Sequence, residues 1–103
     1  MKKLAKRLKP RRETSEREAS RWQEDFAHYL RSECHLAANT VEAYARDLAR
    51  FFEWLRGRRL QSVKVSDLSA YPAWLAELSL APKSIARHVA SLKVFFNFLF
   101  MYI

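Results

Sequence analysis

The sequence predicts an all-α protein, a compact four-helix bundle behind a basic N-terminal tail, and two observations support this. The 103 residues contain one glycine, Gly57, too few for a hairpin-rich sheet or a phosphate-binding loop. From residue 20 onward, apolar residues recur at steps of three and four, which is the spacing of a helix face. A chain of this length, half of it hydrophobic, can bury one modest core. We therefore expect a single domain.

The tail is expected to cover residues 1–19 and the helical domain residues 20–103. Residues 1–12 hold seven Lys and Arg side chains and no acid, so they carry nearly all of the formal net charge of +8. Residues 1–19 contain too little apolar surface to offset the entropy lost on ordering and are predicted to be disordered. The tail could solubilise the protein, lie along phosphates or bind a membrane surface.

Two helices are predicted between residue 20 and Gly57. The first begins at Ser20, a suitable N-cap, and the second begins at Asn39 or Thr40, which are equally suitable. Residues 34–38 separate the two helices, and the second ends before Gly57. Their apolar stripes consist of Trp22, Phe26, Tyr29 and Leu30, followed by Val41, Tyr44, Ala45, Leu48, Phe51, Phe52 and Leu55.

Two further helices are predicted in the second half of the chain. One begins around Ser66, whose hydroxyl can cap it, but Pro72 would remove a hydrogen bond from its interior. That helix must therefore start at Ser69 instead or be kinked. The last helix begins at Pro82 or Lys83, and its core seam is predicted to consist of Ile85, Val89, Leu92, Phe96 and Leu99.

Polar faces on the second and last helices are the candidate binding surfaces. Arg46 and Arg50 are one turn apart and point the same way, whereas Asp47 is interpreted as a surface charge spaced for pairing with Arg50. By itself such a surface is typical of a solvated helix, and a helix that enters a nucleic-acid groove is the alternative. On the last helix the candidate residues are Lys83, Ser84, Arg87, Ser91 and Lys93.

No set of residues suggests catalysis, a metal site or a cofactor. Cys34 and His35 offer two soft ligands where zinc needs three or four, and Cys34 has no oriented base beside it. A single cysteine cannot form an internal disulfide. No apolar run approaches the roughly 20 residues that cross a bilayer. A cytoplasmic protein with no cofactor, no membrane span and no small-molecule ligand is the expectation.

Two segments resemble a known family. Residues 36–55, Leu-Ala-Ala-Asn-Thr-Val-Glu-Ala-Tyr-Ala-Arg-Asp-Leu-Ala-Arg-Phe-Phe-Glu-Trp-Leu, are similar to the pattern L-S-x-N-T-x-x-x-Y-x-R-D-L-x-x-F-x-x-(F/W)-L. Residues 81–99 resemble S-x-x-S-I-x-R-x-L-S-A-L-R-x-F-(F/Y)-x-F-L, and Asp67-Leu68 matches the entry to a third helix. Both patterns belong to the N-terminal core-binding domain of tyrosine recombinases, the phage-integrase and Xer-type family. The resemblance covers about residues 22–99.

The resemblance implies a SAM-like core-binding domain that grips double-stranded DNA beside further recombinase protomers. In this family the second and fourth helices lie against the major groove, and the catalytic residues belong to another domain, expected here after Ile103. No residue of this chain is therefore expected to be catalytic. Arg87 is the implied base-edge contact, and Lys83, Arg46 and Arg50 are the implied phosphate contacts. The full implied DNA-binding set is Asn39, Thr40, Ala43, Arg46, Arg50, Lys83, Ser84, Arg87, Ser91 and Lys93.

The chain departs from the family pattern at several positions, and Val89, Ala90 and Ser91 replace the usual Leu-Ser-Ala. His35 and Ser79 stand where the family often has Gly. Both are expected to close a helix in the left-handed conformation, which His and Ser tolerate less readily than Gly. Lys93 stands where the family has Arg, so it keeps the charge and loses the bidentate geometry.

Two other functions remain open from the sequence. Residues 95–103 are apolar on every side of the helix and need cover. They could be the contact surface of a helical protein-interaction module, with a tail that only solubilises. The tail and residues 98–103 could instead hold the protein on a membrane surface.

Overall fold

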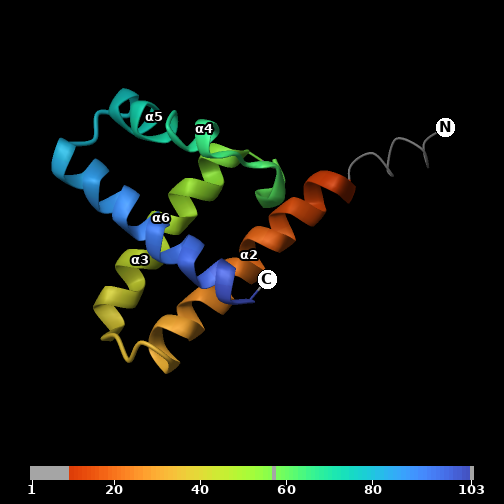
Figure 1. Cartoon of the computed structure of the whole chain (residues 1–103), viewed down its shortest axis with the longest axis vertical. Coiled ribbons are helices and arrows are strands. Elements are labelled where there is room, and N and C mark those ends of the chain that lie inside the picture. Colours follow the sequence, from red (N-terminus) through yellow and green to blue (C-terminus); the bar gives the residue numbers. More distant parts are fainter. Residues whose placement is uncertain (1–9, 57, 103) are drawn as a thin grey trace.

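The computed structural model describes residues 10–56 and 58–102, and these ranges contain helices and no strand (Figure 1). The predicted all-α fold is confirmed. α6 crosses α3 and also contacts α2 and α5, so one core serves all the long helices. The elements in chain order are α2 (Pro10–Ser32), α3 (Ala38–Leu55), the 3-10 turn η1 (Leu60–Ser62), α4 (Val65–Leu68), α5 (Tyr71–Glu77) and α6 (Pro82–Tyr102).

Helix α2 begins at Pro10, ten residues before the predicted start at Ser20. Pro10 occupies the first helical position, where a missing N–H is not needed. The residues that follow are mostly Arg, Glu and Ala, which favour helix even without an apolar stripe. Ser20 therefore lies inside the helix and does not cap it. The part of the predicted tail at residues 1–9 lies outside the described residues.

Helix ends in the left-handed conformation lie at His35 and Ser79, as predicted. Their φ angles are 54° and 67°, and Arg56, which closes α3, has a φ of 50°. The predicted cap of α3 is wrong, because the helix starts at Ala38 and its N-cap Ala37 has no side-chain cap. Asn39 and Thr40 consequently lie in the first turn of α3.

The predicted third helix is interrupted, and Pro72 explains the interruption. The chain forms α4, leaves the helix at residues 69–70 and restarts as α5, with Pro72 in its first turn. Ser66 is not the cap of α4. Instead the carboxylate of Asp67 accepts a hydrogen bond from the backbone N–H of Lys64 at 2.9 Å. A proline is tolerated in a first turn and not in a helix interior, so two short helices replace one.

Aromatic side chains dominate the core. Phe51 of α3 and Phe95 of α6 are fully buried. The ring of Phe26 on α2 meets Phe95 edge-on with 5.2 Å between centroids, and Phe51 meets Tyr71 of α5 edge-on at 5.5 Å. Pairs of this geometry contribute about 0.5–1.5 kcal/mol each beyond their burial. Four helices are thus held at one aromatic cluster.

The buried face of α6 differs from the predicted seam. Leu92 and Leu99 are buried, but Ile85, Val89 and Phe96 are only partly buried. The last turns of α6 are apolar on every side, so apolar spacing could not determine which side faces the core. The described ranges contain no helix that is both long and apolar enough to cross a membrane. The buried residues of α6 are His88, Ser91, Leu92, Phe95, Phe98 and Leu99.

Candidate nucleic-acid interface

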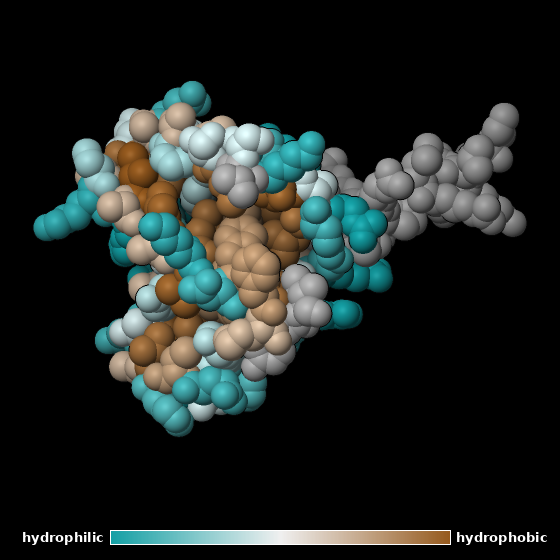
Figure 2. All heavy atoms as spheres, in the orientation of Figure 1, coloured by the Kyte–Doolittle hydropathy of each residue, from teal (hydrophilic) through white to brown (hydrophobic). Residues whose placement is uncertain are grey.

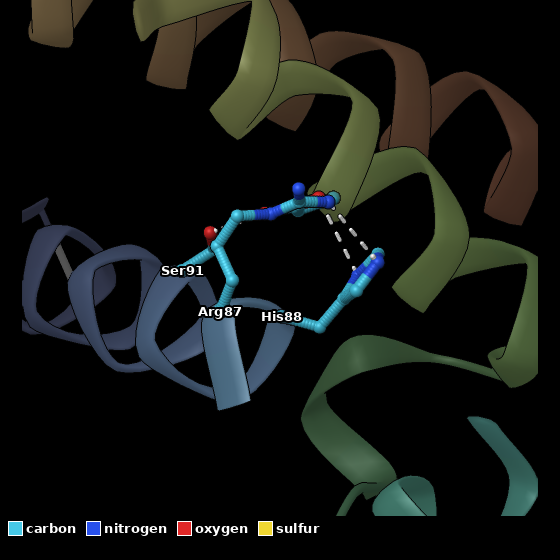
Figure 3. A network of polar contacts seen from close by, with 4 residues as sticks. Arg87, His88 and Ser91 are labelled. Atoms are coloured by element: carbon cyan, nitrogen blue, oxygen red, sulfur yellow. Dashed lines mark hydrogen bonds and ion pairs between the residues drawn. The ribbon is translucent and has the colours of Figure 1, made fainter. Parts of the chain in front are cut away.

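A buried carboxylate lies where α3 meets α6. Asp47 of α3 is 2% exposed. Arg87 donates from Nε to Asp47 Oδ2 at 3.1 Å and from Nη2 to Oδ1 at 2.8 Å, and Ser91 donates from Oγ to Oδ2 at 2.6 Å. Figure 3 shows Arg87, His88 and Ser91 extending from α6 toward α3. Because buried charges are stable only when paired and hydrogen-bonded, this cluster fixes how the two helices cross.

The interpretation of Asp47 as a surface charge is therefore wrong. Arg50, its expected partner, instead lies beside Glu53, with Arg50 Nη1 3.9 Å from Glu53 Oε1. Tyr44, Asp47, Leu48 and Phe51 have the i, i+3, i+4, i+7 spacing of a single helix face. That spacing is the sequence signal that could have placed Asp47 in the apolar stripe.

His88 is the second polar side chain that sequence reasoning missed. It is buried, with Nδ1 3.5 Å from Asp47 Oδ1 and Nε2 3.5 Å from Arg87 Nη2. Burial lowers the pKa of His88 below its usual 6.5, and the charges of Arg87 and Arg50 act in the same direction, against the opposing effect of Asp47. The neutral imidazole is therefore favoured. Its position three residues before Ser91 and seven before Phe95 would have indicated burial.

Arg87 differs from the other members of the cluster because its side chain is 57% exposed. The hydrogen bonds from Arg87 to Asp47 raise its pKa above the usual value, so its charge is permanent. A guanidinium has five N–H donors, and the pair with Asp47 uses one on Nε and one on Nη2. The outer edge of the fork is formed by Nη1, which has no hydrogen bond to the described residues, and by Nη2, which also lies 3.5 Å from His88 Nε2.

A small pocket of about 220 Å³ lies beside Arg87, between α3 and α6. Its walls are mostly small or apolar, and Asp47 and Ser91 reach it from the buried cluster. The pocket joins residues that the sequence placed on two separate faces. Its lining residues are Thr40, Ala43, Tyr44, Asp47, Arg87, Ala90 and Ser91.

The predicted DNA-binding residues do not all share this surface. Thr40, Ala43 and Arg87 are brought together at the pocket. Ser91 is buried against Asp47, so it is removed from the candidate surface. Lys93 lines a different groove, between α6 and the α4–α5 segment. The remaining candidates are exposed or half-buried on α3 and α6, namely Asn39, Arg46, Arg50, Lys83 and Ser84.

Among the described side chains, no group of three or more His, Cys, Asp or Glu residues could hold a metal ion. Cys34 is exposed and free.

Comparison with known proteins gives a consistent family assignment. Residues 24–101 match the family described as "Phage integrase, N-terminal SAM-like domain". The chain is 43% identical over 79 residues to the tyrosine recombinase XerC of Roseiflexus castenholzii, which covers 74% of this chain and 25% of that protein. It is also 36% identical over 80 residues to the tyrosine recombinase XerD of Listeria monocytogenes, covering 74% of this chain and 27% of that protein.

A third relative extends the comparison to another bacterium. The chain is 39% identical over 79 residues to the tyrosine recombinase XerD of Agrobacterium fabrum, covering 75% of this chain and 24% of that protein. The chain thus spans about a quarter of the length of the curated relatives that it matches. No solved structure matches the chain.

Proposed function

Because the chain belongs to the family of phage integrase N-terminal SAM-like domains, we propose that it is the core-binding domain of a site-specific tyrosine recombinase and binds double-stranded DNA. Further recombinase protomers on the same DNA are its expected partners, and the cytoplasm is its expected location. In this proposal strand cleavage and rejoining belong to another domain, and these residues supply grip and orientation.

The observation that carries the proposal is the exposed, anchored guanidinium of Arg87 between two helices that also carry other exposed cations. Arg46 lies on α3, and Lys83 lies at the N-terminal end of α6. Phosphates are attracted to helix N-termini and to Lys and Arg side chains. Lys83, Arg46 and Arg50 are assigned to phosphates in this proposal, and Arg87 is assigned to a base edge.

The neighbouring residues of the proposed surface are short. Asn39 and Thr40 lie in the first turn of α3, Ala43 lies one turn later, and Ser84 lies in the first turn of α6. Short side chains let a helix backbone approach a groove floor, and Asn, Thr and Ser can bond phosphates or bases. This composition supports close docking of both helices in one groove.

Titration of a fluorescent duplex at several salt concentrations tests the proposal. Phosphate contacts release counterions, so the logarithm of the association constant should fall linearly with the logarithm of salt concentration, with a slope of about −0.9 per contact. Arg87→Ala should reduce discrimination at one base pair by about 1–3 kcal/mol. The absence of binding at low salt would refute the proposal.

Exposed apolar groups at the end of α6 favour a second candidate function, protein interaction. Phe100 is 83% exposed, and Met101 is also exposed. Figure 2 shows hydrophobic residues gathered across the middle of one face of the molecule. A groove of about 660 Å³ between α6 and the α4–α5 segment extends this apolar surface, and it includes Val63, Leu68, Val89, Phe96 and Phe100.

Light scattering distinguishes the two candidates. Phe98 is buried, so Phe98→Asp would test folding and not association. Phe100→Asp removes an exposed ring instead, and Leu78→Asp is the matched control at another exposed apolar position. A dimer that is abolished by Phe100→Asp but not by Leu78→Asp, together with no affinity of the protein for DNA, would favour the interaction module.

A further inference from the structure

The geometry points to Asp47 as a positioning residue for DNA recognition. We propose that Asp47 holds Arg87 so that the outer edge of its guanidinium is presented at the pocket between α3 and α6, where it binds the O6 and N7 atoms of a guanine in the major groove. This inference rests on the proposed DNA-binding function and concerns which groups read sequence.

Arg87 keeps three N–H donors that the pair with Asp47 does not use. The pair with Asp47 uses Nε and Nη2, which lie along one edge of the planar group. The adjacent edge is formed by Nη1, which has no hydrogen bond to the described residues, and by Nη2, which lies 3.5 Å from His88 Nε2, beyond the usual length of a hydrogen bond. Guanine presents two acceptors, O6 and N7, at matching spacing in the major groove. Such an acceptor pair would bond Nη1 and replace the long contact of Nη2 with His88, so this edge can act as a bidentate donor pair.

Asp47 is a rigid anchor for the side chain of Arg87. The carboxylate of Asp47 is held from both sides of the helix crossing, because it belongs to α3 and accepts from Ser91 and Arg87 of α6. A free arginine side chain loses rotamer entropy when it is fixed. Since Arg87 is already fixed in the folded protein, less of that loss falls on DNA binding.

Short side chains line the pocket beside the guanidinium of Arg87. Thr40, Ala43 and Ala90 line the pocket beside Arg87, and their side chains are too short to block a base edge. A phosphate contact would not need such an opening. The combination of a fixed donor edge and a shallow apolar opening favours a base over a phosphate as the group bound.

A purely structural ion pair is the competing explanation. The Arg87 side chain is more than half exposed, so water could solvate its charge without Asp47. Structural need therefore accounts for the burial and pairing of Asp47, but it does not require Arg87 to line a pocket. The two explanations differ in what they predict for sequence discrimination at fixed stability.

The experiment uses the 103-residue chain and modified DNA. Selection from random duplexes first gives a preferred site, and each guanine in it is then replaced by 7-deazaguanine, which lacks the N7 acceptor. In the unsubstituted protein one replacement should weaken binding roughly tenfold, toward the lower end of the range for loss of a bidentate contact, because the O6 acceptor remains. In Asp47→Asn the same replacement should change binding by less than about twofold, because an amide cannot accept from both nitrogens of Arg87.

Two control variants separate positioning from general loss of structure. Glu53→Gln neutralises another carboxylate of α3, which lies beside Arg50 and outside the cluster, and should keep the roughly tenfold effect of 7-deazaguanine. Arg87→Lys keeps the charge without the fork, so it should lose that effect while keeping the salt dependence. If Asp47→Asn does not fold, Asp47→Asn and Asp47→Ser are compared in a His35→Gly/Ser79→Gly background, in which both helix ends are relieved of strain.

The outcomes are distinguishable. Loss of 7-deazaguanine sensitivity in folded Asp47→Asn, with sensitivity retained in Glu53→Gln, supports the proposal. Retained sensitivity in Asp47→Asn, or no sensitivity of the unsubstituted chain at any guanine of the site, overturns it while duplex binding by the domain stands. Failure of the unsubstituted chain to bind any duplex would refute the proposed function itself.

Discussion

Asp47 of α3 and Arg87 of α6 are joined by hydrogen bonds of 2.8 and 3.1 Å, although the carboxylate is buried and the guanidinium is largely exposed. The burial is one-sided, so the two residues depend on each other unequally. Asp47 needs a cationic partner to remain charged inside the protein, whereas Arg87 could be solvated without Asp47.

Removal of both partners should cost less than the sum of the two single removals. Arg87→Ala leaves a buried carboxylate with only Ser91 as donor, and we expect it to lower the free energy of unfolding by about 2 kcal/mol. Asp47→Asn should cost about 1 kcal/mol. Because the amide needs no counter-charge, Arg87→Ala in the Asp47→Asn protein should cost less than it does alone. Urea denaturation of the four proteins gives the coupling energy, and strict additivity would contradict this prediction.

His88 predicts a pH dependence of stability. Its pKa is lowered by burial, so below pH 6.5 the unfolded chain binds a proton that the folded protein resists. This contribution to stability is complete above pH 6.5 and is lost as the pH falls toward the lowered pKa. The loss cannot exceed about 1.4 kcal/mol per pH unit. Denaturant midpoints between pH 7.5 and 5.5 measure it, and His88→Gln is the control that should flatten the profile relative to the parent chain.

Two helix ends offer stabilising substitutions. His35 and Ser79 are exposed and have positive φ angles, so replacement by Gly removes backbone strain without loss of packing. His35→Gly and Ser79→Gly should each raise the free energy of unfolding by about 0.5–1 kcal/mol, after the entropy cost of Gly in the unfolded chain. Thermal melts test this expectation. The matched His35→Ala and Ser79→Ala proteins, which keep the Cβ atom, should gain nothing.

The helices of the domain could be predicted from sequence because their apolar residues repeat with the helical period. The left-handed ends at His35 and Ser79 were predicted from the family pattern, which often has Gly at these two positions. The start of α2 at Pro10 was not predicted, because that part of the helix has no apolar stripe. Helix propensity and a proline at the first position favour a helix there, and neither produces the apolar spacing from which the other helices were predicted.

The buried cluster could not be predicted from charge alone. Asp47 and His88 are polar, and a polar residue is assigned to the surface unless a partner from a distant part of the sequence is known. The partner Arg87 lies 40 residues from Asp47, so local spacing could not identify it. Ser91 was assigned to the DNA surface for the same reason, and its burial against Asp47 removes it from that surface.

Tyr71 carries a buried hydroxyl with no hydrogen-bond partner among the described residues. Burial and the nearby charge of Asp47 raise the pKa of this phenol, so it stays neutral. An unpaired buried hydroxyl costs about 1–3 kcal/mol. Tyr71→Phe keeps the ring contact with Phe51 and should therefore raise the free energy of unfolding by about 1 kcal/mol. A loss of stability in urea would show that the hydroxyl has a partner.

Lys83 and Lys93 provide a matched pair for the DNA surface, because they are the same residue on the same helix. Lys83 is exposed at the N-terminal end of α6, beside the first-turn residue Ser84, whereas Lys93 lines the groove toward α4 and α5. If the proposed surface binds phosphates, Lys83→Ala should reduce the magnitude of the salt slope by about 1. Lys93→Ala removes the same charge and should leave the slope nearly unchanged. Equal effects of the two substitutions would indicate that net charge, and not the α3–α6 surface, governs binding.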